Sequence, residues 1–181
     1  MCRGCLLTVR PAPVLGTPRG LDALHVPFSY EGVVRELVAR AKYRDRHAAL
    51  TWLASEMVHA LGPSSDTADV VTWAPTTPQR RRRRGFDQAE LLAVAIGRSL
   101  GVRVRARLRR SSRTTQTGAD RATRVAGPEF AMRKVAETQA FERVLVVDDV
   151  VTTGATMTAA AAALRNGGAI LVVGIAAARR P

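Results

Sequence analysis

One stretch near the C-terminus restricts the possible folds of this chain more than any other. Residues 144–147 are four consecutive apolar residues, typical of a buried strand, and the Ala-rich segment 157–166 predicts a helix. A second apolar run, 170–176, follows the glycine pair that ends this helix. Strand, helix and strand in this order form a parallel, right-handed unit. With strands and helices alternating earlier in the chain, the pattern predicts an α/β fold with a central parallel sheet.

A group of polar residues lies between the first of these strands and the helix. It comprises two adjacent carboxylates and a short turn: Asp148, Asp149, Thr152, Thr153, Gly154, Ala155 and Thr156. Backbone N–H groups and hydroxyls at the start of a helix favour an anion such as a phosphate. The carboxylates can accept hydrogen bonds from vicinal hydroxyls, so the group fits a ribose 5-phosphate. A buried strand with an Asp-rich turn is the purely structural alternative, but it does not explain paired carboxylates before a Thr/Gly loop.

Periodicity and turn residues predict the other elements. Helices are expected over residues 33–41, 50–61 and 87–100, and strands over 69–73 and 102–104. Residues 1–24 are rich in Pro, Gly and Arg and lack periodicity, so they predict an irregular tail before a domain of residues 25–181. Residues 109–128 are polar and basic and predict a long loop, for which a functional lid is one of the few physical reasons.

The chain is strongly basic, with 28 Lys and Arg residues against 15 Asp and Glu residues. The resulting net charge of +13 favours anionic partners, either phosphorylated metabolites or nucleic acid. Five consecutive arginines, Arg80 to Arg84, follow a predicted loop at 76–79, and such a run is either a solvated patch or a contact with phosphate. Only 4% of residues are aromatic, which leaves few side chains for stacking on bases.

The sequence also bears on the compartment. No apolar run approaches the ~20 residues of a membrane span, and the first five residues lack the apolar core of a signal peptide. The expected location is therefore the cytoplasm. The chain has only two cysteines, which cannot form a disulfide framework.

Residues 144–156 resemble the 5-phosphoribosyl-1-diphosphate (PRPP) motif of the type I phosphoribosyltransferases. The match covers thirteen positions, while the signatures of dinucleotide sites and P-loops are absent. The resemblance implies a type I phosphoribosyltransferase fold, in which helices flank a central parallel sheet and an N-terminal helical hood covers the site. It also implies that Asp148 and Asp149 bind the ribose hydroxyls, that Thr152 to Thr156 hold the 5-phosphate, and that Mg²⁺ accompanies PRPP.

Further stretches resemble the ComF family. They are Tyr30-Glu31-Gly32, Trp73 to Pro78, Arg84 to Ala93, and Gln116-Thr117-Gly118 with Arg121. ComF proteins are phosphoribosyltransferase-like and are associated with DNA uptake in competent bacteria. The resemblance implies a diphosphate-binding loop and a lid, with these residues: Pro75, Thr76, Thr77, Arg81 and Arg84 in the loop, and Gln116, Thr117 and Arg121 in the lid.

The chain departs from its relatives at three places. Family members often carry an N-terminal zinc finger with two cysteine pairs, whereas Cys2 and Cys5 supply one pair, and half a site cannot close a tetrahedral zinc. Zinc is therefore not expected unless two chains share it. Residues 123–130 form a shorter lid stretch without the usual Asn. Thr152 stands where purine-salvage relatives carry a proton-moving Asp, and Thr cannot do this at neutral pH, which leaves an amine or a similar acceptor.

Two main classes of function stay open, beside a transcriptional regulator on this fold, for which the sequence shows no helix-turn-helix segment. The chain is either a phosphoribosyltransferase acting on an unknown acceptor, or a non-catalytic protein that senses PRPP or serves DNA uptake by binding single-stranded DNA or a helicase partner. The intact motif favours ligand binding, and the basic composition with the missing base favours the second class. The acceptor and the oligomeric state leave no mark in the sequence.

Overall fold

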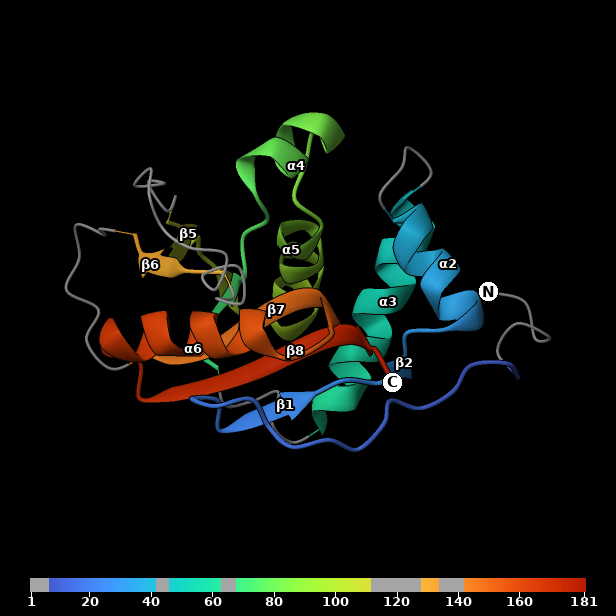
Figure 1. Cartoon of the computed structure of the whole chain (residues 1–181), viewed down its shortest axis with the longest axis horizontal. Coiled ribbons are helices and arrows are strands. Elements are labelled where there is room, and N and C mark those ends of the chain that lie inside the picture. Colours follow the sequence, from blue (N-terminus) through green and yellow to red (C-terminus); the bar gives the residue numbers. More distant parts are fainter. Residues whose placement is uncertain (1–6, 42–45, 63–67, 112–127, 134–141) are drawn as a thin grey trace, which may run out of the picture.

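The computed structural model describes residues 7–41, 46–62, 68–111, 128–133 and 142–181. A six-stranded sheet forms its centre, with the order β1-β8-β7-β3-β4 and with β2 also beside β8. Strands β1, β2, β7 and β8 of this sheet are labelled in Figure 1. The strands are β1 (Ala23–His25), β2 (Phe28–Ser29), β3 (Val70–Trp73), β4 (Arg103–Val104), β7 (Arg143–Val151) and β8 (Leu171–Arg179). Every pair in this sheet is parallel, which confirms the predicted sheet.

Helices cover both faces of the sheet because β7 is apolar on both faces. Val144 and Val146 belong to the buried cluster formed with α6 (Ala155–Asn166), and Leu145 and Val147 to the cluster formed with α3 and α5. Such alternation follows from the opposite directions of successive side chains along a strand. The other helices are α2 (Gly32–Arg40), α3 (Arg46–Leu61), α4 (Pro78–Arg84) and α5 (Gln88–Leu100). Helices α2 and α3 lie in the region predicted to form the hood. They pack on each other, and α3 also packs on α5 and β8.

Several elements lie where the sequence predicts them, and α5 shows why. Its first turn is capped by Asp87, whose side chain accepts a hydrogen bond from the Ala89 N–H at 3.2 Å. Its end is set by Gly101, which has a φ of 66°, a conformation that glycine adopts without strain. The predicted helices over 33–41 and 50–61 and the strands over 69–73 and 170–176 correspond to α2, α3, β3 and β8.

The arginine run, for which the sequence predicts no element, is helical, and the helix includes residues 78 and 79 of the predicted loop. Helix α4 begins after Thr77, whose hydroxyl accepts a hydrogen bond from the Arg80 N–H at 3.2 Å, and ends at Gly85, with a φ of 80°. Pro78 occupies the first turn, where a missing N–H costs nothing. None of the residues of α4 is buried, so the helix lacks the apolar face from which periodicity is recognised.

Two other differences concern strands. β7 continues beyond its predicted end and pairs with β8 as far as Val151, so both aspartates lie within it. Strands β5 (Leu108–Arg110) and β6 (Phe130–Met132) form a small antiparallel sheet, so residues 109 and 110 belong to a strand rather than to the predicted loop. Residues 112–127 of that loop lie outside the described residues.

β1 begins at Ala23, within the segment predicted to be irregular. In the described part of the chain, no helix has both the length and the apolar character needed to cross a membrane.

Candidate functional site

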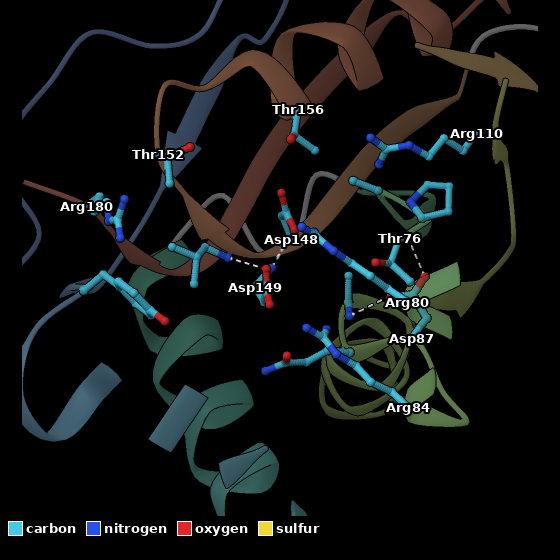
Figure 2. Close-up of a pocket in the computed structure, with 16 residues that line it drawn as sticks. Thr76, Arg80, Arg84, Asp87, Arg110, Asp148, Asp149, Thr152, Thr156 and Arg180 are labelled. Atoms are coloured by element: carbon cyan, nitrogen blue, oxygen red, sulfur yellow. Dashed lines mark hydrogen bonds between the residues drawn. The ribbon is translucent and has the colours of Figure 1, made fainter. Parts of the chain in front are cut away.

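A cleft of about 430 Å³ opens where β3 and β7 end, at the carboxyl edge of the sheet. Ligands of open parallel sheets characteristically bind at this edge. The cleft is lined by Tyr30, Ala74, Pro75, Thr76, Arg80, Arg84, Asp87, Gln88, Ala89, Arg110, Asp148, Asp149, Val150, Thr152, Thr156 and Arg180. Figure 2 shows the two adjacent aspartates between a group around Arg80 and Arg84 on one side and the two threonines with Arg180 on the other.

The paired carboxylates are fixed by the backbone that carries them. Oδ1 of Asp148 accepts a hydrogen bond from the Asp149 N–H at 2.8 Å, and Oδ1 of Asp149 accepts one from the Val150 N–H at 2.8 Å (Figure 2). Burial, and next the negative charge of Asp149, raise the pKa of Asp148 well above its usual value. Ionising both carboxylates therefore costs free energy, which hydroxyl donors or a cation in the cleft would offset.

The turn after β7 places hydroxyls at the N-terminus of α6. Gly154 is the N-cap with a φ of 78°, and the Thr153 hydroxyl accepts a hydrogen bond from the Ala155 N–H at 3.3 Å. Thr152 and Thr156 line the cleft, whereas the other three residues of the predicted phosphate turn are not among its lining residues. The first N–H groups of a helix have no partner within the helix, so this end of the cleft suits an anion.

Asp87 shapes the opposite wall, formed by the loop after β3. It is 2% exposed, and its Oδ2 accepts a hydrogen bond from the Thr76 N–H at 2.8 Å while Oδ1 caps α5 (Figure 2). Burial raises the pKa of Asp87, and its hydrogen bonds from the backbone oppose that shift. One carboxylate thus joins the loop to the helix. Of the residues predicted for the diphosphate loop, Pro75 and Thr76 line the cleft, and Thr77 caps α4.

Among the described residues, four arginines line the cleft, and one of these four, Arg84, is among the cations predicted for the diphosphate loop. The other predicted cation, Arg81, lies 3.4 Å from the Glu90 carboxylate and is not a lining residue. Arg80, which precedes Arg81 on α4, lines the cleft instead (Figure 2). Arg110 comes from β5 and lies 5.7 Å from the centre of the Phe130 ring. Burial, and next the charge of Arg80, lower the pKa of Arg110.

Sequence reasoning missed part of the lining. The polar and charged lining residues that the sequence did not assign to the site are Tyr30, Arg80, Asp87, Gln88, Arg110 and Arg180. Tyr30 and Asp87 belong to stretches that carry the ComF resemblance, so the resemblance held a signal for them. Arg110 is the last residue of β5 and Arg180 directly follows β8, and no local sequence pattern marks either residue as part of a site. The predicted lid residues Gln116, Thr117 and Arg121, and the cysteines Cys2 and Cys5, lie outside the described residues.

Comparison with known proteins gives the family. A model described as the phosphoribosyl transferase domain matches residues 87–180, just over half of the chain. The chain belongs to this family. Its fold is the type I phosphoribosyltransferase fold, as predicted. A solved purine phosphoribosyltransferase from Pyrococcus horikoshii has a similar structure, with 15% sequence identity, a TM-score of 0.44, and coverage of 72% of this chain and 83% of that chain. No curated protein matches the chain significantly.

Proposed function

We propose that this chain binds PRPP with Mg²⁺ in the cleft and transfers its phosphoribosyl group to an acceptor. One observation carries the proposal: the paired carboxylates of β7 lie in a cleft between the N-terminus of α6 and a wall of arginines. PRPP carries a diol between a 5-phosphate and a 1-diphosphate, so its charges match this order. Asp148 and Asp149 would accept hydrogen bonds from the ribose hydroxyls, and the turn with Thr152 and Thr156 would bind the 5-phosphate.

The diphosphate would lie against the wall formed by Thr76 and the arginines. Arg80, Arg84 and Arg110 supply positive charge there, and arginine pairs well with phosphate oxygens. The Thr76 loop is held by Asp87 before any ligand arrives. Donors that are already in place where negative charge grows lower the barrier to departure of a leaving group.

The described residues fit a metal that arrives with its ligand. Mg²⁺ usually binds one or two carboxylates together with water and substrate phosphates. Asp148 and Asp149 supply such carboxylates, and the described residues include no cluster of three or more His, Cys, Asp or Glu side chains that could hold a metal alone. When bound, Mg²⁺ would supply positive charge to the departing diphosphate.

Transfer would break the bond between C1 of the ribose and the diphosphate oxygen, which keeps the electron pair. The lone pair of the acceptor would form the new bond to C1, and the proton that an amine acceptor then loses would pass to water or to the departed diphosphate. Thr152 cannot remove a proton from the acceptor at neutral pH, which favours an amine or another acceptor that needs no base at this position. Asp148 and Asp149 would orient the sugar, and the arginines would stabilise the leaving group.

Thermal unfolding tests the binding step directly. PRPP with Mg²⁺ should raise the melting temperature, because a ligand that binds only the folded state stabilises it. The double variant Asp148→Asn, Asp149→Asn should lose this rise and still fold, since neither substitution removes volume. Asp69→Asn is the control, because Asp69 is exposed and pairs with Arg143 outside the cleft. Equal ligand-induced shifts in the parent and the double variant would refute the assignment.

The finer assignment, a ComF-like protein, rests on the stretches around Tyr30, Trp73 and Arg84, and it brings a second candidate function. This is a non-catalytic protein that senses PRPP or serves DNA uptake through single-stranded DNA or a helicase partner. Its support is the exposed side of α4, where Arg82 and Arg83 are not cleft residues. Two arginines presented on one short helix suit contacts with a phosphate backbone.

Salt dependence tests this second candidate. For a single strand, each lost phosphate contact lowers the slope of log affinity against log salt by about 0.7. The variant Arg82→Gln, Arg83→Gln should therefore bind an oligonucleotide with a slope reduced by about 1.4, while its PRPP shift stays at the parent value. A parent protein with no measurable oligonucleotide binding at low salt would exclude the DNA-binding role.

A further inference from the structure

A segment outside the matched family domain packs against the turn that would bind the 5-phosphate. Residues 15–22, here the N-terminal strap, bring Pro18 onto Gly154, the N-cap of α6. A Cβ at Gly154 would lie 3.0 Å from Cγ and 3.4 Å from Cβ of Pro18. Glycine is needed there for two reasons, the close approach of Pro18 and a φ of 78°.

The strap is tied to the sheet before Pro18. The guanidinium of Arg179 donates to the backbone oxygens of Leu15 at 3.5 Å and Gly16 at 3.3 Å. Arg179 is 8% exposed and ends β8, and the next residue, Arg180, lines the cleft. A buried arginine that holds two carbonyl groups fixes the start of the strap relative to this edge of the sheet.

The strap is also tied after Pro18. Leu21 donates its N–H to the Pro18 oxygen at 3.2 Å, which closes a tight turn. Arg165 of α6 forms an ion pair with Asp22 and donates to the Gly20 oxygen at 3.4 Å. Asp22 accepts a hydrogen bond from the Val172 N–H at 2.7 Å. Pro18 is therefore fixed between anchors on β8 and α6; α6 begins within the turn, and β8 pairs with β7, the strand that leads into the turn.

We propose that the N-terminal strap holds the turn of residues 152–156 in the shape that binds a 5-phosphate, with Pro18 as the positioning residue. This inference rests on the proposed function. Backbone donors bind an anion well only when they are fixed in advance, because ordering them on binding costs free energy. Gly154 has the widest conformational freedom of any residue in the turn, and the Pro18 ring packs against it. The strap thus acts through the turn and does not touch the ligand.

Two partial ligands separate this role from general stabilisation. Ribose 5-phosphate would use the turn and the carboxylates, whereas pyrophosphate with Mg²⁺ would use the Thr76 wall. In calorimetric titrations, Pro18→Gly should weaken ribose 5-phosphate binding by about five- to tenfold and change pyrophosphate binding by less than about twofold. Pro13→Gly is the matched control, because it adds the same backbone freedom five residues earlier, outside the strap. Among the described residues, the atoms that approach the position of a Gly154 Cβ belong to Pro18 and not to Pro13. Pro13→Gly should bind both probes like the parent.

A second variant covers the possibility that Pro18→Gly does not fold. Arg165→Met removes the ion pair that anchors the strap after Pro18, so it should also weaken ribose 5-phosphate binding. Arg165 does not line the cleft, so pyrophosphate binding should not change. Unchanged ribose 5-phosphate binding in both folded variants would overturn the strap inference while leaving the proposed function intact. Equal weakening of both probes would also overturn it, since that pattern indicates a general loss of structure. A parent that binds neither ribose 5-phosphate nor PRPP would instead overturn the proposed function.

Discussion

Replacement of Asp87 should separate the stability of this fold from the function of its cleft. The Asp87 carboxylate accepts backbone hydrogen bonds that serve two purposes. Its bonds from the N–H groups of Ala89, at 3.2 Å to Oδ1, and Glu90 cap α5, and the bond from the Thr76 N–H, at 2.8 Å to Oδ2, holds the loop after β3. Asp87→Ala removes all of these bonds. Asp87→Asn keeps an oxygen for the cap but places an NH₂ group, which cannot accept, opposite Thr76.

The expected losses follow from these contacts. Removing an N-cap costs about 1 kcal/mol, and leaving a half-buried backbone N–H unpaired costs about 1–2 kcal/mol. Asp87→Ala should therefore lower the free energy of unfolding by about 2–3 kcal/mol. For a chain of this size, that corresponds to a fall in melting temperature of about 5–10 °C. Asp87→Asn should lose about half as much, because its cap survives.

Urea unfolding followed by circular dichroism measures the stability, and calorimetric titration with pyrophosphate and Mg²⁺ measures the loop. Both variants should bind pyrophosphate more weakly than the parent to a similar extent, because both lose the bond to Thr76. The stability order should be parent, then Asn, then Ala. An Asn variant as unstable as the Ala variant would show that the cap is not what Asp87 contributes. Parent-like pyrophosphate binding in the folded Asn variant would show that the Thr76 loop does not depend on Asp87.

Two more substitutions test the physical argument away from Asp87. The pKa of Asp148 is raised above its usual value of 3.8, so the folded state keeps a proton that the unfolded state loses, and stability falls as pH rises through the interval above 3.8. Asp148→Asn should therefore have a higher free energy of unfolding than the parent near neutral pH, and this free energy should fall less than that of the parent as the pH rises from acid to neutral. If urea unfolding shows the same pH dependence for both proteins, the argument is contradicted. Gly97→Ala would push a methyl group into the Val104 side chain and to 2.9 Å from the Val102 oxygen. It should lower the free energy of unfolding, measured by chemical denaturation, by about 1–3 kcal/mol. Parent-like stability would show that the neighbouring residues move to make room for the methyl group.

The centre of the fold was predictable because its signals are local. The apolar run of β7, the Gly154 turn and the Ala-rich α6 follow one another in sequence, and the chain order alone makes the unit parallel. The same holds for α5, where Asp87 and Gly101 lie directly at the two ends. Of the site, Asp148, Asp149 and the threonines of the turn stood out for this reason. Their assignment to a ligand stays a prediction.

The rest of the site depends on distant pairing or on weak signals. Helix α4 has end signals in Thr77, Pro78 and Gly85, but its exposed arginines have no apolar period, so the sequence indicates a solvated patch or a phosphate contact and no helix. Arg110 reaches the cleft because β5 pairs with β6, two strands of three residues each that are separated by nineteen positions in the sequence. Short strands with so little periodicity cannot be paired from sequence. Arg110 is a cleft residue because of where β5 lies in the fold, and nothing in its own residue type or its sequence neighbours indicates this.

The cost of burying Asp148 beside Asp149 has a functional implication. Folding alone would favour an amide or an apolar residue at position 148, because the raised pKa records an unfavourable environment for the charged form. Strongly perturbed titratable groups in a cleft are associated with function more often than with stability. The proposed ligand would relieve this cost, since ribose hydroxyls donate to carboxylates and Mg²⁺ neutralises them. The same free energy that lowers the stability of the empty protein would then strengthen PRPP binding, so Asp148→Asn should gain stability and lose affinity together.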